Sequence, residues 1–286
     1  MDRTANGWGS GLLGVIIFSG SLPATRVAVG DFSPLFLTSA RAVIAALLGA
    51  AFLVVLRQVR PGRSDLGSLV VVALGVVIGF PLLTALALQH ITSAHSIVFI
   101  GLLPLATAIF GVLRGGERPK PMFWLFSGLG AATVVGFALS SSDIGSLTGD
   151  LLMVAAIVLC GLGYAEGATL SRRLGGWQVI SWALLLALPM MVAVALITMP
   201  ESWSEIGGPA WLGLAYVSIF SMLVGFVFWY RGLALGGIAG VGQLQLLQPF
   251  FGLALAGLLL HEPVALTMVA VTGFVVLCVA GAKRFA

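Results

Sequence analysis

Long stretches of uncharged apolar residues alternate with short polar or Gly- and Pro-rich separators along the whole chain. A helix that crosses the roughly 30 Å hydrocarbon core of a bilayer needs about 20 such residues. The separators, such as 57–65, 114–121 and 200–209, are too short to hold a soluble domain. The pattern predicts ten transmembrane helices, at residues 9–29, 34–56, 66–88, 94–113, 121–140, 149–170, 177–199, 209–231, 239–260 and 264–282.

Composition excludes most soluble classes of protein. Only 8% of the 286 residues are charged and 59% are hydrophobic, whereas about 25% of a soluble domain is charged. A mean hydropathy of +1.13 is typical of a polytopic membrane protein. The pI near 9.6 then reflects basic residues that set membrane topology, and no nucleic-acid partner is expected.

The basic residues favour one side of the predicted membrane. Twelve Lys and Arg fall in the two terminal segments, in the loops after spans 2, 4 and 6, and at the junction after span 8. The opposite loops hold Arg26 at most, together with several acidic residues. Because short cytoplasmic loops carry the excess of Lys and Arg, we expect both termini in the cytoplasm.

An internal repeat runs through the chain at a constant spacing of 145 residues. Pro104 matches Pro249, and an acid follows thirteen residues later in each case, as Glu117 and Glu262. Such an arrangement is unlikely by chance in a chain with 12 prolines and 10 acids. The repeat therefore predicts two units of five helices each.

The two units are expected at residues 1–140 and 141–286. Because five is an odd number, the second unit enters the membrane from the opposite face. The predicted fold is an all-α integral membrane protein with an inverted five-plus-five repeat.

Several of the repeated residues belong to the pattern of a known family. They are Trp229–Leu235 followed by Ala239, Pro249 and Glu262; Leu86–Leu88 followed by Ala94, Pro104 and Glu117; Gly149–Asp150 with 169–174; and Arg41 after Ser33–Pro34. Over essentially the whole chain this pattern resembles the EamA family of the drug/metabolite transporter superfamily. Within it, the sequence is similar to bacterial exporters of amino acids with aromatic substrates. The resemblance implies a multi-pass secondary transporter of the bacterial inner membrane, with a central cavity between the halves.

Two glutamines mark a predicted binding site. Gln245 and Gln248 lie three residues apart on one face of a span, just before Pro249. Polar groups at membrane depth are costly, so they indicate either helix contacts or a water-lined path. Glutamine can donate to a carboxylate and accept from an ammonium group, which suits a zwitterion. The alternative is that both glutamines only bond to neighbouring helices.

Other polar and aromatic residues in the spans complete the predicted site. His95 could bind a carboxylate or take up a proton, or else bond to loop backbone. Phe99 follows it at helical spacing, and Tyr164 suits a pocket of mixed polarity. The remaining members lie in spans that resemble the cavity-lining helices of the family: Ser19, Ser21, Phe80 and Thr84.

Four prolines inside the spans are predicted bending points for alternating access: Pro23, Pro81, Pro104 and Pro249. Two charged residues in the spans are interpreted as structural. Arg41 is expected to extend toward the membrane surface as an anchor, and Glu166 to pair near the cytoplasmic end of its helix.

Motifs of enzymes are missing from the sequence. No nucleotide-binding G-x-x-x-x-G-K-[ST], no H-E-x-x-H and no G-x-S-x-G occurs. We therefore expect no enzymatic activity, no cofactor and no metal site. The expected function is export of small organic metabolites, most simply amino acids, with a small-molecule substrate and membrane lipid as partners and the monomer as the working unit. The alternatives are a sugar, nucleotide-sugar or drug carrier, and a non-transporting structural membrane subunit.

Overall fold

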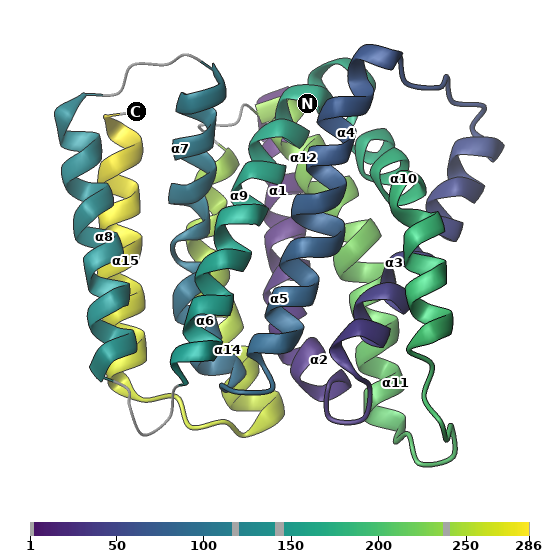
Figure 1. The fold of residues 1–286 in the computed structure, drawn as a ribbon. Coiled ribbons are helices and arrows are strands. Elements are labelled where there is room, and N and C mark those ends of the chain that lie inside the picture. Colours follow the sequence, from purple (N-terminus) through teal and green to yellow (C-terminus); the bar gives the residue numbers. More distant parts are fainter. Residues whose placement is uncertain (1–2, 116–119, 141–145, 237–240, 286) are drawn as a thin grey trace.

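The structure is a computed structural model, and it describes residues 3–115, 120–140, 146–236 and 241–285. Every regular element in these ranges is a helix, and most run side by side along one direction (Figure 1). Up to residue 140 they are α1 (Arg3–Ser19), α2 (Ser21–Ala28), α3 (Pro34–Val55), η1 (Arg63–Asp65), α4 (Leu66–Val72), η2 (Ala73–Gly79), α5 (Phe80–Ala87), α6 (Ser93–Ile100), α7 (Leu103–Gly115) and α8 (Pro121–Ser140). From residue 147 they are α9 (Leu147–Leu174), α10 (Gly176–Ile197), α11 (Gly208–Ala215), η3 (Tyr216–Val224), α12 (Gly225–Gly236), η4 (Gly242–Leu247), α14 (Gln248–Leu260) and α15 (Leu266–Arg284).

Seven helical stretches in the described ranges are long and apolar enough to cross a bilayer. They cover residues 6–28, 34–55, 63–87, 93–113, 147–174, 176–197 and 208–233. Three shorter apolar helices, at 121–134, 244–260 and 266–278, fall in the remaining expected spans. The all-helical class is confirmed, while the count of ten spans stays a prediction.

Local sequence explains where the long helices begin and end. α3 starts after Ser33, whose hydroxyl accepts a hydrogen bond from the backbone N–H of Phe36 at 3.2 Å, and Pro34 fills the first position. α9 ends at Gly175, whose φ of 92° is open to glycine and costly for other residues. That turn reverses the chain into α10.

Glycines let the N-terminal helix approach α12 closely. A Cβ on Gly232 would lie 2.7 Å from the backbone nitrogen of Gly11, and one on Gly14 would lie 3.0 Å from that of Trp229. Small residues at a helix crossing allow this contact between backbones in a membrane. The crossing places α1 against Trp229, which is almost completely buried.

Two helices contain π-helical segments at overlapping places of the repeat. η2 covers residues 73–79 and η3 covers 216–224, so the spacing of 145 residues superposes the first on the second. A π-turn inserts an extra residue into a helix and is frequent at functional sites. The repeat thus extends from sequence to an irregularity of the backbone.

The helices are also interrupted before the two matched prolines. α6 ends at Ile100 and α7 begins at Leu103, just before Pro104. In the other half, the 3₁₀ segment η4 precedes α14, whose second residue is Pro249. Proline has no N–H to continue an α-helical ladder, which accounts for both breaks.

The first expected span is not one continuous helix, because it is interrupted at Gly20 between α1 and α2. Pro23 lies in the first turn of α2, and Pro81 directly follows η2. All four predicted hinge residues therefore lie close to an irregularity of the backbone. Motion at these places stays a prediction.

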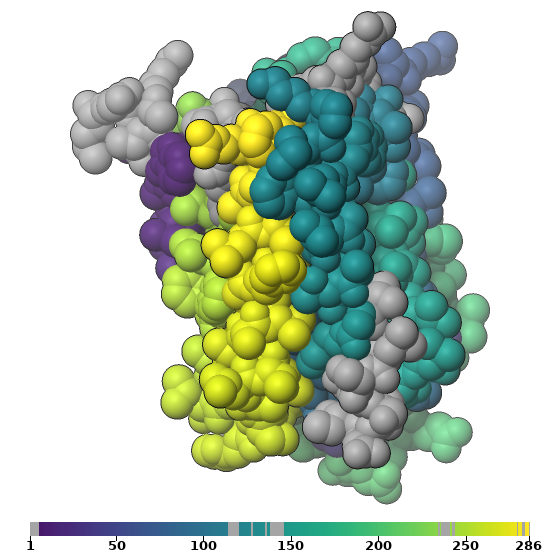
Figure 2. All heavy atoms as spheres, turned by 90° about the vertical axis from the view of Figure 1, so that its left-hand side faces the viewer, coloured from purple at the N-terminus to yellow at the C-terminus, as the bar shows by residue number. Residues whose placement is uncertain are grey.

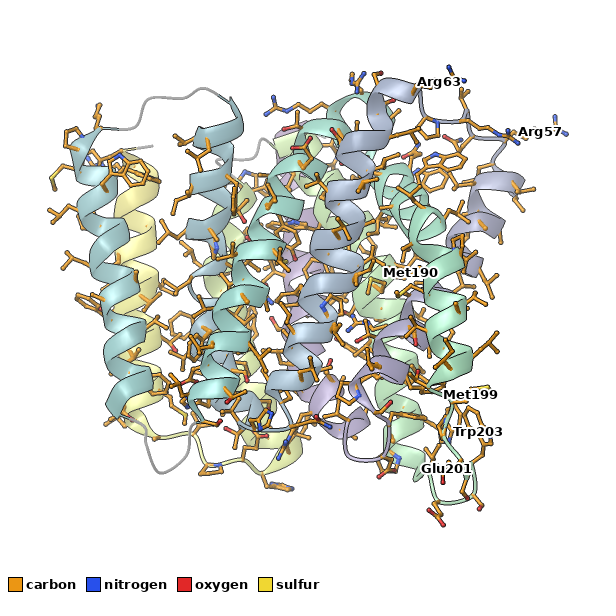
Figure 3. The ribbon with its side chains drawn as sticks, viewed as in Figure 1. Arg57, Arg63, Met190, Met199, Glu201 and Trp203 are labelled. Atoms are coloured by element: carbon orange, nitrogen blue, oxygen red, sulfur yellow. The ribbon has the colours of Figure 1, made fainter. Side chains whose placement is uncertain are left out.

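Two arginines and one glutamate labelled in Figure 3 lie at opposite ends of the molecule. Arg57 and Arg63 lie at the end of the molecule that also carries both chain termini, and Met199, Glu201 and Trp203 lie at the other (Figures 1 and 3). This polarity agrees with the charge pattern of the sequence.

The pair α8 and α15 packs together at one edge of the molecule (Figures 1 and 2). The rings of Phe126 and Phe285 stack with centroids 6.0 Å apart, and the backbone N–H of Lys120 donates to the carbonyl of Phe285. The internal cavity lies among the remaining helices.

Candidate functional site

An internal cavity lies between helices from both halves of the chain. Its residues come from α1, α2, α3, η2, α5, α6, α7, α9, η3, α12 and α14, and they are Phe18, Ser21, Leu22, Arg41, Val76, Phe80, Pro81, Ile100, Leu103, Cys160, Tyr164, Ser221, Phe226 and Gln248. The volume open to the centres of water-sized spheres is about 30 Å³, room for roughly two water molecules. An organic metabolite is much larger, so these helices must separate to admit one.

One wall of the cavity is polar. The hydroxyls of Ser21 and Ser221 are 2.7 Å apart, and Nη2 of Arg41 donates to the Ser221 hydroxyl at 3.3 Å. Gln248 is also buried, and its Oε1 has no hydrogen-bond partner among the described residues. The wall therefore offers a guanidinium, hydroxyls and an amide to a polar ligand.

Aromatic rings form another wall of the cavity. Phe18 packs edge-on against Phe226 with ring centroids 5.0 Å apart, and Tyr164 meets Phe226 at 5.9 Å in the same manner. Phe80 adds a further ring to the lining. Such a wall suits an apolar or aromatic group, because ring faces and edges pack well against other rings.

Four of the nine predicted binding residues line this cavity, and one predicted hinge does so with them: Ser21, Phe80, Tyr164 and Gln248, with Pro81. Ser19 lies just behind the lining, where its hydroxyl donates to the carbonyl of Val15 at 2.7 Å and to that of Gln248 at 3.3 Å. Their roles in binding stay predictions.

Gln245 and Thr84 are buried but outside the lining. The hydroxyl of Thr84 donates to the carbonyl of Phe80 at 2.8 Å, within its own helix. Nε2 of Gln245 has no hydrogen-bond partner among the described residues. The two glutamines thus occupy different surroundings although both are on one segment.

His95 and Phe99 also lie outside the lining, in α6. Nε2 of His95 is 2.8 Å from Oδ1 of Asp150 at the start of α9, and the imidazole packs near Phe99 and Phe137 with centroids 5.7 Å and 4.8 Å away. His95 and Phe99 are completely or almost completely buried. In the described conformation the imidazole bonds to a carboxylate of the protein itself.

Glu262 caps α6 from the loop after α14. Its carboxylate accepts hydrogen bonds from the Ser93 hydroxyl and the backbone N–H of Ala94, both at 2.7 Å, and from the backbone N–H of Ser93 at 3.2 Å. A carboxylate at a helix N-terminus satisfies free N–H groups and complements the helix dipole. Its counterpart in the repeat, Glu117, lies outside the described residues.

The structure corrects the interpretation of Arg41. We expected its side chain to extend toward the membrane surface, but the residue is only 5% exposed and its guanidinium faces Ser221 in the cavity. The sequence offered no means to distinguish the two directions, because both are open to a long side chain. Glu166 accepts a hydrogen bond from the Ser68 hydroxyl at 2.5 Å, which agrees with its predicted structural role.

Sequence reasoning missed Ser221 and Phe226, although the repeat contained a signal for Phe226. At the spacing of 145 residues, Val76 matches Ser221 and Pro81 matches Phe226. All four line the cavity, as do the matched Leu103 and Gln248. Transferring the predicted hinge Pro81 onto the other half would have found Phe226, whereas Ser221 matches Val76, a position that the sequence analysis did not single out.

A second hollow, of about 380 Å³, lies between α14 and α15. Its lining is entirely apolar: Phe250, Leu253, Ala254, Gly257, Leu258, Val264 and Val269. It offers no polar side chain to orient a ligand, so the internal cavity is the better candidate site.

These features define a class: a helical membrane protein built around an internal cavity, with matching positions of a repeated unit in its walls. The EamA-like transporter family matches residues 6–139 and again 147–282. The chain belongs to this family, so it is a transporter and not an enzyme.

Similar proteins carry the same general description. The uncharacterized transporter YdeK of Bacillus subtilis (strain 168) is 67% identical over 286 residues, which cover 100% of both chains. The uncharacterized transporter sll0355 of Synechocystis sp. (strain ATCC 27184 / PCC 6803 / Kazusa) is 23% identical over 85% of this chain and 79% of its own length. One crystal structure covers all of both chains at 19% identity with a TM-score of 0.70, which supports the fold alone.

Proposed function

We propose that the protein is a secondary transporter that exports small organic metabolites across the bacterial inner membrane by alternating access. Amino acids, including aromatic ones, are the proposed substrates. The proposal fits a cavity that joins hydroxyls and an amide to several aromatic rings. Such a cavity can hold the polar backbone of an amino acid at one wall and its side chain at the other.

The observation that carries the proposal is that the cavity lies between the two repeated halves of the chain. Its walls contain matched pairs from the two halves: Val76 with Ser221, Pro81 with Phe226 and Leu103 with Gln248. Transporters built from inverted repeats bind their substrates at the interface of the repeats, where rocking of one against the other exposes the site to either side.

The proposed topology completes this mechanism. We propose ten spans, formed by an inverted pair of five-helix units at residues 1–140 and 141–286, with both termini cytoplasmic. It is supported by the gathering of Arg57 and Arg63 at the end that carries the termini (Figure 3). The monomer is the proposed working unit, because one chain contains the complete cavity.

Two alternative functions remain to be tested. A sugar, nucleotide-sugar or drug carrier would use the same scaffold, but the aromatic wall and single guanidinium favour an amino acid. A structural subunit would need no internal polar wall, and burying polar groups at membrane depth has a cost.

Counterflow in liposomes tests the proposal. Liposomes that contain the purified protein are loaded with one unlabelled amino acid, and entry of the labelled compound is followed for a panel that includes phenylalanine, tryptophan, leucine and alanine. Val76→Trp should block counterflow by filling the cavity. Val70→Trp, at a 41% exposed position of the preceding segment, is the matched control and should leave it intact.

The outcomes separate the three functions. Counterflow of amino acids that Val76→Trp abolishes supports the proposal. Counterflow of sugars or drugs alone would assign the scaffold to another cargo. A folded protein that moves no solute of any class would favour the structural subunit.

A further inference from the structure

Arg41 stands out because it is a buried cation in a cavity wall. It lies seven residues after the start of α3, which places it roughly 10 Å along the helix axis at 1.5 Å per residue. Only 5% of the residue is exposed. An isolated charge at such depth is strongly disfavoured unless an opposite charge accompanies it.

The protein supplies Arg41 with weak compensation. Its one described hydrogen bond goes from Nη2 to the neutral hydroxyl of Ser221 at 3.3 Å, and its Nε has no partner among the described residues. Ser221 is held in turn by the hydroxyl of Ser21. A guanidinium carries five N–H donors, so most of its capacity remains free to bind a ligand.

The acidic residues of the described ranges are engaged or exposed elsewhere. Asp31 accepts from Gly207, Asp65 pairs with Arg173, Asp150 with His95, Glu166 with Ser68, Glu262 caps α6, and Glu201 and Glu205 lie exposed in the loop before α11. None of these carboxylates lines the cavity. Within the described part of the chain, Arg41 therefore lacks a counter-ion.

We infer that Arg41 is the anion-binding residue of the transport site and that it selects substrates with a carboxylate joined to an apolar or aromatic body. The inference rests on the proposed function and narrows its substrate class. A carboxylate matches the planar fork of a guanidinium with two parallel hydrogen bonds. The hydroxyls of Ser21 and Ser221 lie beside that fork, and the rings of Phe18 and Phe226 receive the body of the substrate.

The charge argument also excludes other cargoes. A cationic drug would meet an uncompensated positive charge, and a neutral sugar would leave it unpaired. A carboxylate neutralises the guanidinium and offsets part of the penalty of its burial. Binding of a carboxylate substrate is therefore what balances the charge of Arg41 at this site.

Binding by the purified protein tests the inference without relying on transport. The probes share one phenyl ring: phenylalanine, 3-phenylpropionate, phenylalaninamide and 2-phenylethylamine, with acetate and chloride as small anions. Calorimetric titration and the melting temperature in detergent are measured on the wild-type protein and on Arg41→Gln, Arg41→Lys and the exposed control Arg231→Gln.

We expect the wild type and Arg231→Gln to bind phenylalanine and 3-phenylpropionate at least about tenfold more tightly than the amide and the amine. Arg41→Gln should lose this preference, and Arg41→Lys should keep part of it, because it keeps the charge without the fork. Since the wild type alone must prefer carboxylates, the test stands even if Arg41→Gln fails to fold.

Equal binding of acid and amide by the wild type would overturn the inference. So would an unchanged preference in folded Arg41→Gln, or equal stabilisation by acetate, chloride and 3-phenylpropionate, since a general anion site has no use for the aromatic wall. Carboxylate binding that depends on Arg41, together with no transport in liposomes, would contradict the proposed function and leave intact only the assignment of Arg41 as a carboxylate-binding residue.

Discussion

Nε2 of His95 and Oδ1 of Asp150, 2.8 Å apart and buried, join the first turn of α6 to the first turn of α9. The two residues are 55 positions apart in the chain and belong to different matched segments of the family. Their pairing gives the buried carboxylate and one ring nitrogen of the buried imidazole a hydrogen-bond partner, while Nδ1 of His95 has none among the described residues.

Replacing His95 with Ala should destabilise the protein by about 3–5 kcal/mol, because the buried Asp150 carboxylate loses its partner. The double variant with Asp150→Ala should lose less than the sum of the single changes, since it leaves no unpaired charge. Melting temperatures in detergent give both values. If His95→Ala instead keeps its stability and loses substrate binding, the histidine belongs to the transport site.

Gln248 and Gln245 should respond differently to the same change. Gln248→Leu leaves a polar group of the ligand unpaired in the cavity, which costs about 1–3 kcal/mol, or roughly 5- to 150-fold in affinity. Gln245→Leu, outside the lining, should leave affinity intact and change stability little, because Nε2 of Gln245 has no hydrogen-bond partner to lose among the described residues. Substrate titration and melting temperature on one detergent sample measure both, and equal losses of affinity would contradict the assignment.

Pro104→Ala and Pro249→Ala each restore an N–H donor at an interrupted helix. We expect folded proteins with straighter helices and transport slowed by roughly tenfold, about 1.4 kcal/mol on the barrier. Pro209→Ala is the matched control, because this proline begins α11 after a loop, whereas Pro104 and Pro249 each follow another helical segment. The measurement is the initial transport rate at equal amounts of reconstituted protein. Unchanged rates in both variants would show that the helix breaks serve packing and not transport.

Reporter proteins fused to the chain test the proposed membrane topology. Alkaline phosphatase, which is active only outside the cytoplasm, should be active after Ser146, and a fluorescent protein after Ala286 should fluoresce in the cytoplasm. An inactive fusion at Ser146 would place both halves in one orientation and rule out the inverted repeat.

The sequence predicted the helices well and the cavity in part. Apolar runs of about 20 residues are a direct consequence of bilayer thickness, so their positions could be read without a structure. The direction of the Arg41 side chain could not be predicted from the sequence. It depends on whether α3 presents Arg41 to Ser221 or to lipid. The partner of Glu262 could not either, since it caps a helix 168 residues earlier in the chain.

The irregular backbone was beyond sequence reasoning for a related reason. Nothing in the composition of residues 73–79 or 216–224 distinguishes a π-helix from an α-helix, because the same kinds of side chain occur in both.

The π-helical segments also determine which side chains of their helices point into the cavity. Val76 and Pro81 are five residues apart and both line the cavity, as do Ser221 and Phe226. In an α-helix, five residues advance about 500°, which would turn the second side chain well away from the first, whereas a π-turn brings residues five apart nearly into line. In each half, the two lining residues therefore share a face because one surplus residue delays the rotation of the helix. Deleting the surplus residue from η2 would return the segment to an α-helix and leave Val76 and Pro81 four positions apart, a spacing that also places both side chains on one face, so this side of the cavity would survive the loss of that residue.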